Sequence, residues 1–224
     1  MSKGYFITGT DTECGKTEIT LGLMQLLQLK EQRVLGMKPV ASGAEQAPAG
    51  LRNEDAVRIR RQASLSVSYD LVNPYAFEPP IAPHLAAEQA GVEVDFEKIR
   101  LYYRKLSNQA DRVIVEGVGG WRVPLNSGQT VTDLAVDLGL PVILVVGLKL
   151  GCINHALLTV ESIRASGVTL AGWVANVADP LMLEPEGNLD SLKARIDAPL
   201  LGFVPRMDQP DAAAIASLLD QGLQ

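Results

Sequence analysis

The sequence is poor in the features that mark secreted and membrane proteins. Only two cysteines occur among its 224 residues, Cys14 and Cys152. They lie far apart, so a disulfide framework is not expected, and this fits a reducing compartment. The longest apolar run, LPVILVVGL from Leu140, is far too short to span a bilayer. The first residues, MSKGYFITGTDTE, lack the h-region of a signal peptide. We therefore expect a cytoplasmic protein with no membrane segment.

Basic residues are fewer than acidic ones, and histidine is scarce. The chain carries 20 Lys and Arg against 26 Asp and Glu, a net charge of -6, and it has no Lys/Arg run. Binding to nucleic acid or anionic lipid therefore has little support, and we expect neither partner. Cys152 and His155 have the spacing of a metal-binding pair. Because no other Cys or His lies near them in the sequence, we do not expect a metal there.

The sequence is rich in apolar residues, at 47%, which is enough for one domain with a full core over residues 1–224. Short apolar runs predict strands at residues 5–9, 33–40, 111–117, 141–147, 170–176 and 200–205. Helical spacing predicts helices at residues 16–32, 96–109, 131–139, 153–167, 189–196 and 211–223. The strands are apolar on both faces, which is typical of parallel strands covered on both sides by helices. The pattern predicts an α/β fold with an open, mostly parallel sheet.

Three segments fall outside these elements. Residues 44–50 and 178–188 have the composition of surface loops. Residues 64–83 are proline-rich, and the pattern assigns no element to them.

The stretch GTDTECGKT, residues 9–17, ends as a phosphate-binding P-loop ends. It has five residues between Gly9 and the Gly-Lys pair, one more than the usual pattern. A chance glycine turn is the alternative, but the stretch follows a predicted strand and opens a predicted helix, as the motif requires. Backbone N–H groups of residues 13–17 would cradle phosphates at the helix N-terminus. Lys16 would reach the β- and γ-phosphates, and Thr17 would bind Mg²⁺. We therefore expect a P-loop NTPase type of fold with a nucleotide site.

Charged residues lie at the ends of two other predicted strands. Ligands of open parallel sheets bind beyond the carboxyl ends of the strands. Lys38 ends one strand, and we interpret it as facing a phosphate or another anion because a buried lysine needs a partner. Glu116 ends another, and Mg²⁺ usually takes one or two carboxylates plus phosphate. Asp55 is a second candidate ligand, although the residues alone favour an acid that begins a helix.

Together these residues resemble a known family. The segments GTDTECGKT, GMKPVASG, LRNEDA, PPIAPHLAAE, VEGVGGWRVPL, PVILVVGLKLGCINHALLT, LAGWVAN and LLGFVP are similar, in order and spacing, to those of dethiobiotin synthetase. The match runs from the N-terminus to about Pro205, and the five-residue spacing belongs to this family's loop.

The resemblance implies a Mg²⁺-dependent homodimer of biotin biosynthesis. Its substrates would be ATP, CO₂ or bicarbonate, and 7,8-diaminopelargonic acid. One amine captures CO₂ as a carbamate, and ATP phosphorylates that carbamate to a mixed anhydride. The second amine then closes the cyclic urea of dethiobiotin and releases phosphate.

The resemblance also implies a role for each matching position. Lys38 is the active-site lysine beside the carbamate, with Lys16 and Thr12 as further catalytic residues. The metal positions are Thr17, Asp55 and Glu116. The nucleotide-binding positions are Glu13, Cys14, Gly15, Lys16, Thr17, Asp55, Glu116, Gly117, Val118, Gly119, Asn176, Pro205, Arg206 and Met207. The substrate-binding positions are Thr12, Lys38, Ser42, Gly119, Gly151, Cys152, Ile153 and Asn154, and the last four would take the substrate carboxylate from the second subunit.

Three other functions fit part of the pattern. A switch ATPase of the partitioning or maturation type often carries an early lysine, K-G-G-x-x-G-K-T, where this chain has Thr-Asp-Thr-Glu. An amide-forming ligase acting on a different acid is the second, and a catalytically silent nucleotide-binding partner is the third. The intact set of Lys16, Lys38, Asp55 and Glu116 argues against the third. The segment after Pro205 resembles the family only loosely, with Asp211 as a candidate counterpart of a family acid.

Overall fold

A six-stranded parallel sheet forms the centre of the computed structural model, which describes residues 4–219. The strand order is β10-β9-β8-β1-β7-β2, and every neighbouring pair is parallel. The strands are β1 (Gly4–Gly9), β2 (Val34–Met37), β7 (Arg112–Glu116), β8 (Val142–Leu148), β9 (Leu170–Val177) and β10 (Leu200–Val204). The predicted open parallel sheet is confirmed.

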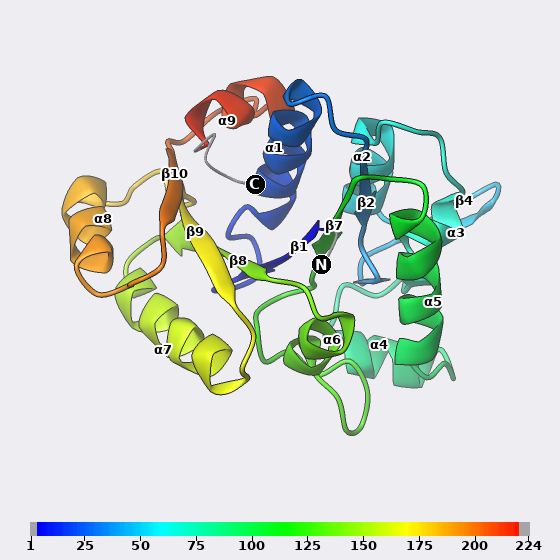
Figure 1. The fold of residues 1–224 in the computed structure, drawn as a ribbon. Helices are drawn as coiled ribbons and strands as arrows, with labels where there is room; N and C mark the ends of the chain where they lie inside the picture. Colours follow the sequence, from blue (N-terminus) through cyan, green and yellow to red (C-terminus); the bar gives the residue numbers. More distant parts are fainter. Residues whose placement is uncertain (1–3, 220–224) are drawn as a thin grey trace.

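Helices cover both faces of this sheet (Figure 1). One face carries α1 (Lys16–Leu29), α2 (Glu54–Gln62) and α9 (Ala212–Leu218). The other carries α5 (Phe96–Ser107), α6 (Val131–Leu138) and α7 (Cys152–Ala165). A further helix, α8 (Pro185–Lys193), lies near α7 and the β10 edge. Because the strands are parallel, their carboxyl ends meet at one edge of the sheet, where ligands of such folds bind.

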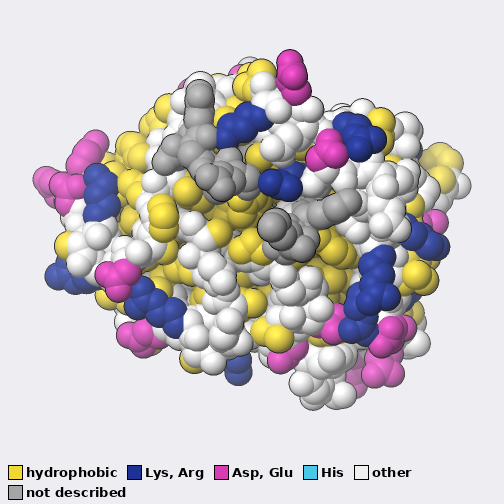
Figure 2. Space-filling model, in the orientation of Figure 1, with side chains coloured by type: hydrophobic (Ala, Val, Ile, Leu, Met, Phe, Trp, Pro, Cys, Tyr) yellow, Lys and Arg dark blue, Asp and Glu magenta, His cyan; other side chains and the backbone are white. Residues whose placement is uncertain are grey.

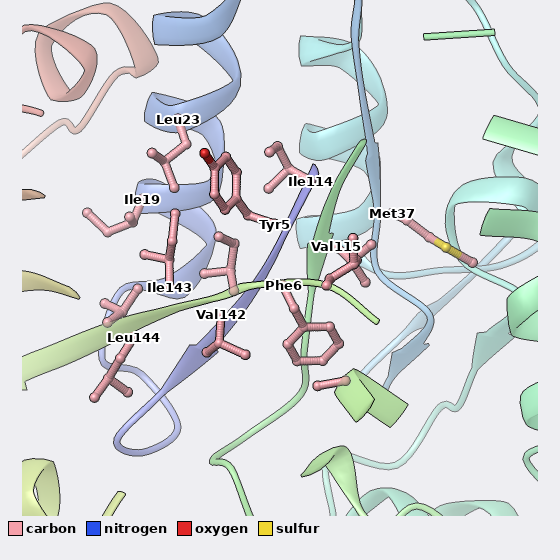
Figure 3. Packing of buried hydrophobic residues seen from close by; sticks show 14 of the residues in the cluster. Tyr5, Phe6, Ile19, Leu23, Met37, Ile114, Val115, Val142, Ile143 and Leu144 are labelled. Atoms are coloured by element: carbon pink, nitrogen blue, oxygen red, sulfur yellow. The ribbon is translucent and has the colours of Figure 1, made fainter. Parts of the chain in front are cut away.

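The core explains why the strands are apolar on both faces. β1 is buried along its whole length. Figure 3 shows Tyr5 pointing from β1 toward Leu23 of α1, and Phe6 pointing to the opposite face. Successive side chains of a strand alternate between the faces, so a sheet covered on both sides needs apolar residues at every position.

The predicted strand at residues 33–40 is wrong in one respect, because it forms two separate strands. β2 ends at Met37, and β3 (Val40–Ala41) pairs with β6 (Tyr75–Ala76) in a separate two-stranded sheet. The backbone N–H of Lys38 donates to the carbonyl of Val72 at 2.8 Å, and Pro39 has no N–H to give to the main sheet. The chain therefore leaves the main sheet at Lys38.

Several other elements differ from the sequence prediction. The segment at residues 44–50 contributes to a hairpin of β4 (Glu45–Ala47) and β5 (Gly50–Arg52). The unassigned segment holds α3 (Tyr69–Val72) and β6, and α4 (Pro83–Gln89) follows it. α8 begins at Pro185, inside the predicted loop at residues 178–188, because proline suits the first turn of a helix. The predicted closing helix at residues 211–223 ends at Leu218 as α9, and its residues 220–223 lie outside the described part of the chain.

The surface carries charges of both signs. On the face seen in Figure 2, basic and acidic side chains are interspersed around the periphery, and hydrophobic side chains gather nearer the middle. None of the helices described within residues 4–219 combines the length and the apolar character that a membrane-spanning helix needs.

Candidate active site

The phosphate loop connects the end of β1 to the start of α1. Gly15 has a φ of 92°, and a Cβ atom there would lie 2.2 Å from Nδ2 of Asn176. That Nδ2 donates to the carbonyl of Cys14 at 3.0 Å. Glu13 also has a positive φ, of 59°. Glycine is therefore required at position 15, both for the backbone conformation and for the close approach of Asn176.

Asp11 shapes the first half of this loop. Its carboxylate accepts from the Thr12 N–H at 2.8 Å and from Lys149 Nζ at 2.7 Å. Its carbonyl accepts from Lys16 Nζ at 2.9 Å. The hydrogen bond from Lys149 is the main reason why the pKa of Asp11 lies below its usual value. Sequence reasoning did not single out Lys149, because nothing in the chain pattern pairs residues so far apart.

Three charged side chains meet at the carboxyl ends of β2 and β7. Lys38 Nζ lies 2.8 Å from Oδ2 of Asp55 and 2.5 Å from Oε1 of Glu116. Burial would lower the pKa of Lys38, but the charges of Glu116 and Asp55 outweigh it, so the pKa lies above the usual lysine value. Burial would likewise raise the pKa of Asp55, but the charge and hydrogen bond of Lys38 lower it overall. The two carboxylates therefore favour the ammonium form of Lys38.

The same cluster fits a divalent cation. Oε1 of Glu116 accepts from the Thr17 hydroxyl at 2.9 Å. Oε2 of Glu116 is buried without a hydrogen-bond partner among the described residues, and such a carboxylate oxygen needs a cation or a donor. No group of three or more His, Cys, Asp or Glu side chains within residues 4–219 forms a metal cage. Mg²⁺ does not need one, because it uses one or two carboxylates and completes its shell with phosphate and water.

These residues share one cleft with a volume of about 660 Å³. The cleft is lined by Thr12, Glu13, Gly15, Lys16, Thr17, Glu18, Lys38, Ser42, Asn53, Asp55, Pro80, Ile81, Ala82, Pro83, Glu116, Val118, Gly119 and Val123. Of these, sequence reasoning did not single out Glu18, Asn53, Val123 or residues 80–83. The run Pro-Pro-Ile-Ala-Pro was the available signal for the last group, since it is apolar and irregular beside a predicted site.

A smaller pocket of about 160 Å³ adjoins the phosphate loop. It contains the predicted nucleotide-binding residues Asn176, Pro205, Arg206 and Met207, together with Glu13 and Gly15. Asp211 is not among the residues lining it. Its carboxylate caps α9 by accepting from the N–H groups of Ala213 and Ala214 at 2.8 and 3.0 Å, so helix capping explains this acid.

Some predicted site residues lie outside both cavities. Cys14 is 2% exposed and packs in the core. Gly117 donates its N–H to the Ile7 carbonyl at 2.9 Å, and a Cβ there would lie 3.1 Å from the Phe6 ring. Gly117 therefore packs against β1 and does not line the cleft. Residues 151–154 form the start of α7 and do not line the cleft of their own chain.

Solved structures of low sequence identity share this fold. A chain of the MinC:MinD cell division protein complex of Aquifex aeolicus has a TM-score of 0.56 at 15% identity, covering 96% of this chain and 84% of that chain. A ParA family ATPase from Chlorobium tepidum has a TM-score of 0.56 at 12% identity, covering 98% and 91%. These likenesses confirm the predicted P-loop NTPase type of fold and nothing further.

Similarity in sequence is much closer. A family model described as an AAA domain matches residues 3–214. Curated relatives named ATP-dependent dethiobiotin synthetase BioD include one from Aromatoleum aromaticum, 52% identical over 217 residues, and one from Cellvibrio japonicus, 50% identical over 218 residues. Both alignments cover 97% of this chain and 96% of the relative. The chain therefore belongs to the dethiobiotin synthetase family.

Proposed function

We propose that this protein is an ATP-dependent ligase that forms dethiobiotin from 7,8-diaminopelargonic acid and CO₂, with ADP and phosphate as the other products. The observation that carries the proposal is the position of Lys38. This buried ammonium group shares a cleft with the phosphate-loop lysine, Lys16. A site that joins two anions, a carbamate and a triphosphate, needs positive charge from more than one direction.

The cleft has two kinds of wall, which suit the two parts of the diamine. Residues 80–83 supply an apolar wall to pack against the alkyl chain of the substrate. Thr12 of the phosphate loop, Ser42 and Gly119 line other parts of the cleft. The buried hydroxyl of Ser42 has no hydrogen-bond partner among the described residues. A hydroxyl left in this state is suited to bind an amine or a carbamate oxygen.

The proposed reaction has three steps. One amine adds to CO₂ and loses a proton, which gives a carbamate held beside Lys38. A carbamate oxygen then attacks the γ-phosphorus, the bond to ADP breaks, and Lys16 and Lys38 stabilise the charge that spreads over the phosphoryl oxygens. The second amine attacks the carbamate carbon, loses a proton and expels phosphate. Holding the reactants in line is worth up to about 7–11 kcal/mol of barrier.

Thr17, Asp55 and Glu116 would hold Mg²⁺. The ion, when bound, would supply charge that neutralises the β- and γ-phosphates. Glu116 is the strongest candidate ligand, since its Oε2 atom is buried without a partner among the described residues. Asn176 and residues 205–207 would hold the adenine, because they line the smaller pocket beside the phosphate loop.

We also propose that the protein is a homodimer whose second subunit completes the site. Residues 151–154 would bind the substrate carboxylate through N–H groups at the start of α7, where a helix favours anions. Three leucines on the loops after β8 and β9 are strongly exposed. Leu150, Leu181 and Leu183 are 97%, 83% and 86% exposed. The Asp179 N–H donates to the Leu148 carbonyl at 3.3 Å, which brings their two loops together. Exposed leucines on adjoining loops are typical of interaction surfaces.

Phosphate release from ATP tests the function. We expect release to require both the diamine and bicarbonate, because the carbamate that attacks the γ-phosphate forms only when both are present. Brisk hydrolysis without the diamine would instead favour a switch ATPase. Release that requires another amine or acid would favour a different amide-forming ligase.

A further inference from the structure

Arg58 and Glu18 form an ion pair to which the proposed reaction gives no role. Arg58 Nη1 donates to Oε1 of Glu18 at 2.5 Å, and Nη2 donates to Oε2 at 2.7 Å. The two side chains are 31% and 24% exposed. A guanidinium that faces a carboxylate with two parallel hydrogen bonds is the strongest geometry for an ion pair, and partial burial shields it from solvent.

Glu18 lies between the two cavities that would hold a bound nucleotide. It follows Thr17 directly in the first turn of α1, and it lines both the large cleft and the smaller pocket. A nucleotide with its phosphates in one and its base in the other would lie beside the Glu18 carboxylate. Without a partner, the Glu18 carboxylate would repel the phosphates. In the structure, the positive charge of Arg58 neutralises it.

Arg58 also links Glu18 to the helix that carries Asp55. Asp55 and Arg58 are three positions apart on α2, so they project from the same side of the helix. Asp55 reaches Lys38, and Arg58 reaches the start of α1. The far end of α2 is tied separately, by hydrogen bonds from Gln62 to Gln25 and Gln28, both 2.9 Å. The Arg58–Glu18 pair therefore fixes α2 to α1 at the end nearer the cleft.

We propose that Arg58 is a positioning residue for nucleotide binding. By pairing with Glu18 it neutralises a carboxylate beside the phosphate loop, and it holds Asp55 in register with Thr17. The inference rests on the nucleotide half of the proposed function. Its test uses binding of a non-hydrolysable ATP analogue without the diamine, so it succeeds or fails independently of ring closure.

Calorimetric titration of the analogue AMP-PNP, in EDTA and in Mg²⁺, separates the two effects. In EDTA, Arg58→Ala should weaken binding about tenfold, because Glu18 is left unpaired. Adding Glu18→Ala to that variant should recover at least about threefold of the loss, because the repelling carboxylate is gone. In Mg²⁺, Arg58→Ala, Glu18→Ala and the double variant should each gain less affinity from the ion than the wild type does, because each lacks the ion pair that positions Asp55.

The matched control is Arg61→Ala, which removes the same charge from the exposed end of α2. It should bind the analogue as the wild type does. Thermal unfolding of each variant checks that the fold is kept, and Glu18→Ala alone tests the link to Asp55 if Arg58→Ala does not fold. Three results would each overturn the proposal: unchanged binding by Arg58→Ala, a double variant that binds no more tightly than Arg58→Ala, or an unchanged Mg²⁺ effect in all variants.

Discussion

Lys38 is buried, and burying a lysine charge costs free energy of folding unless an ion pair or a ligand compensates it. It is 5% exposed and lies between two carboxylates, one of which, Glu116, is fully buried. Replacing a buried ion cluster with apolar side chains is often neutral or stabilising, so the fold alone does not explain why charges stand here. A site that receives phosphate and carbamate does explain it, since both are anions that the ammonium group would stabilise.

Lys38→Ala should lower turnover by about 100-fold or more, because it removes charge that stabilises the transferring phosphoryl group. Nucleotide binding should change far less, since the phosphate loop and its own lysine remain. Steady-state kinetics with the diamine, together with calorimetric titration of the nucleotide, check the two halves. Lys193→Ala, on the exposed surface of α8, is the charge-matched control. Turnover in Lys38→Ala equal to that of the control would remove Lys38 from the catalytic residues.

At this scale, the sequence predicted the residues whose chemistry is local. Lys16 and Thr17 belong to a contiguous motif, and Lys38 and Glu116 end apolar runs. Asp55 was ambiguous, because its pairing with Lys38 depends on how α2 packs. Lys149 and Arg58 were not predicted, since each pairs with a residue distant in sequence, Asp11 and Glu18 respectively. Nothing in a single chain's pattern reveals such pairs.

At the scale of elements, the parallel sheet gathers the site. β1, β2 and β7 lie side by side, so the phosphate loop, Lys38 and Glu116 meet at one edge although they are far apart in the chain. Long strands and helices were predicted well because their apolar periods are regular. The split after β2 was not predicted, because it depends on a hydrogen bond from the Lys38 N–H to the carbonyl of Val72, which is a tertiary contact.

The loops after β8 and β9 allow a test of the proposed dimer. Leu181→Asp combined with Leu183→Asp should raise the dissociation constant of the dimer at least about 100-fold, because charge replaces apolar contact area. Activity should fall with it, since the second subunit would supply the carboxylate site. Analytical ultracentrifugation measures the association. Leu29→Asp, at another exposed leucine at the end of α1 (68% exposed), should leave the dimer intact. A double variant that remains dimeric and active would contradict this arrangement.

At the scale of the whole molecule, proteins of different kinds share this fold. Chains that share this fold at 12% and 15% identity include a ParA family ATPase and part of a cell division complex. The shared fold therefore does not identify the substrates, which depend on the residues of the site. In this chain, Lys38, Ser42 and residues 80–83 form a wall of the cleft that also contains the phosphate loop. The central claim is that this wall holds a carbamate in line with the γ-phosphate.

Oxygen tracing tests that claim most directly. With ¹⁸O-labelled bicarbonate, diaminopelargonate and unlabelled ATP, a carbamate oxygen that attacks phosphorus stays with the phosphate when the ring closes. The account therefore predicts that the released phosphate carries one labelled oxygen, detected by mass spectrometry or by the ³¹P isotope shift. Phosphate released in step with dethiobiotin but without the label would mean that water, and not the carbamate, receives the phosphoryl group, and would contradict the account.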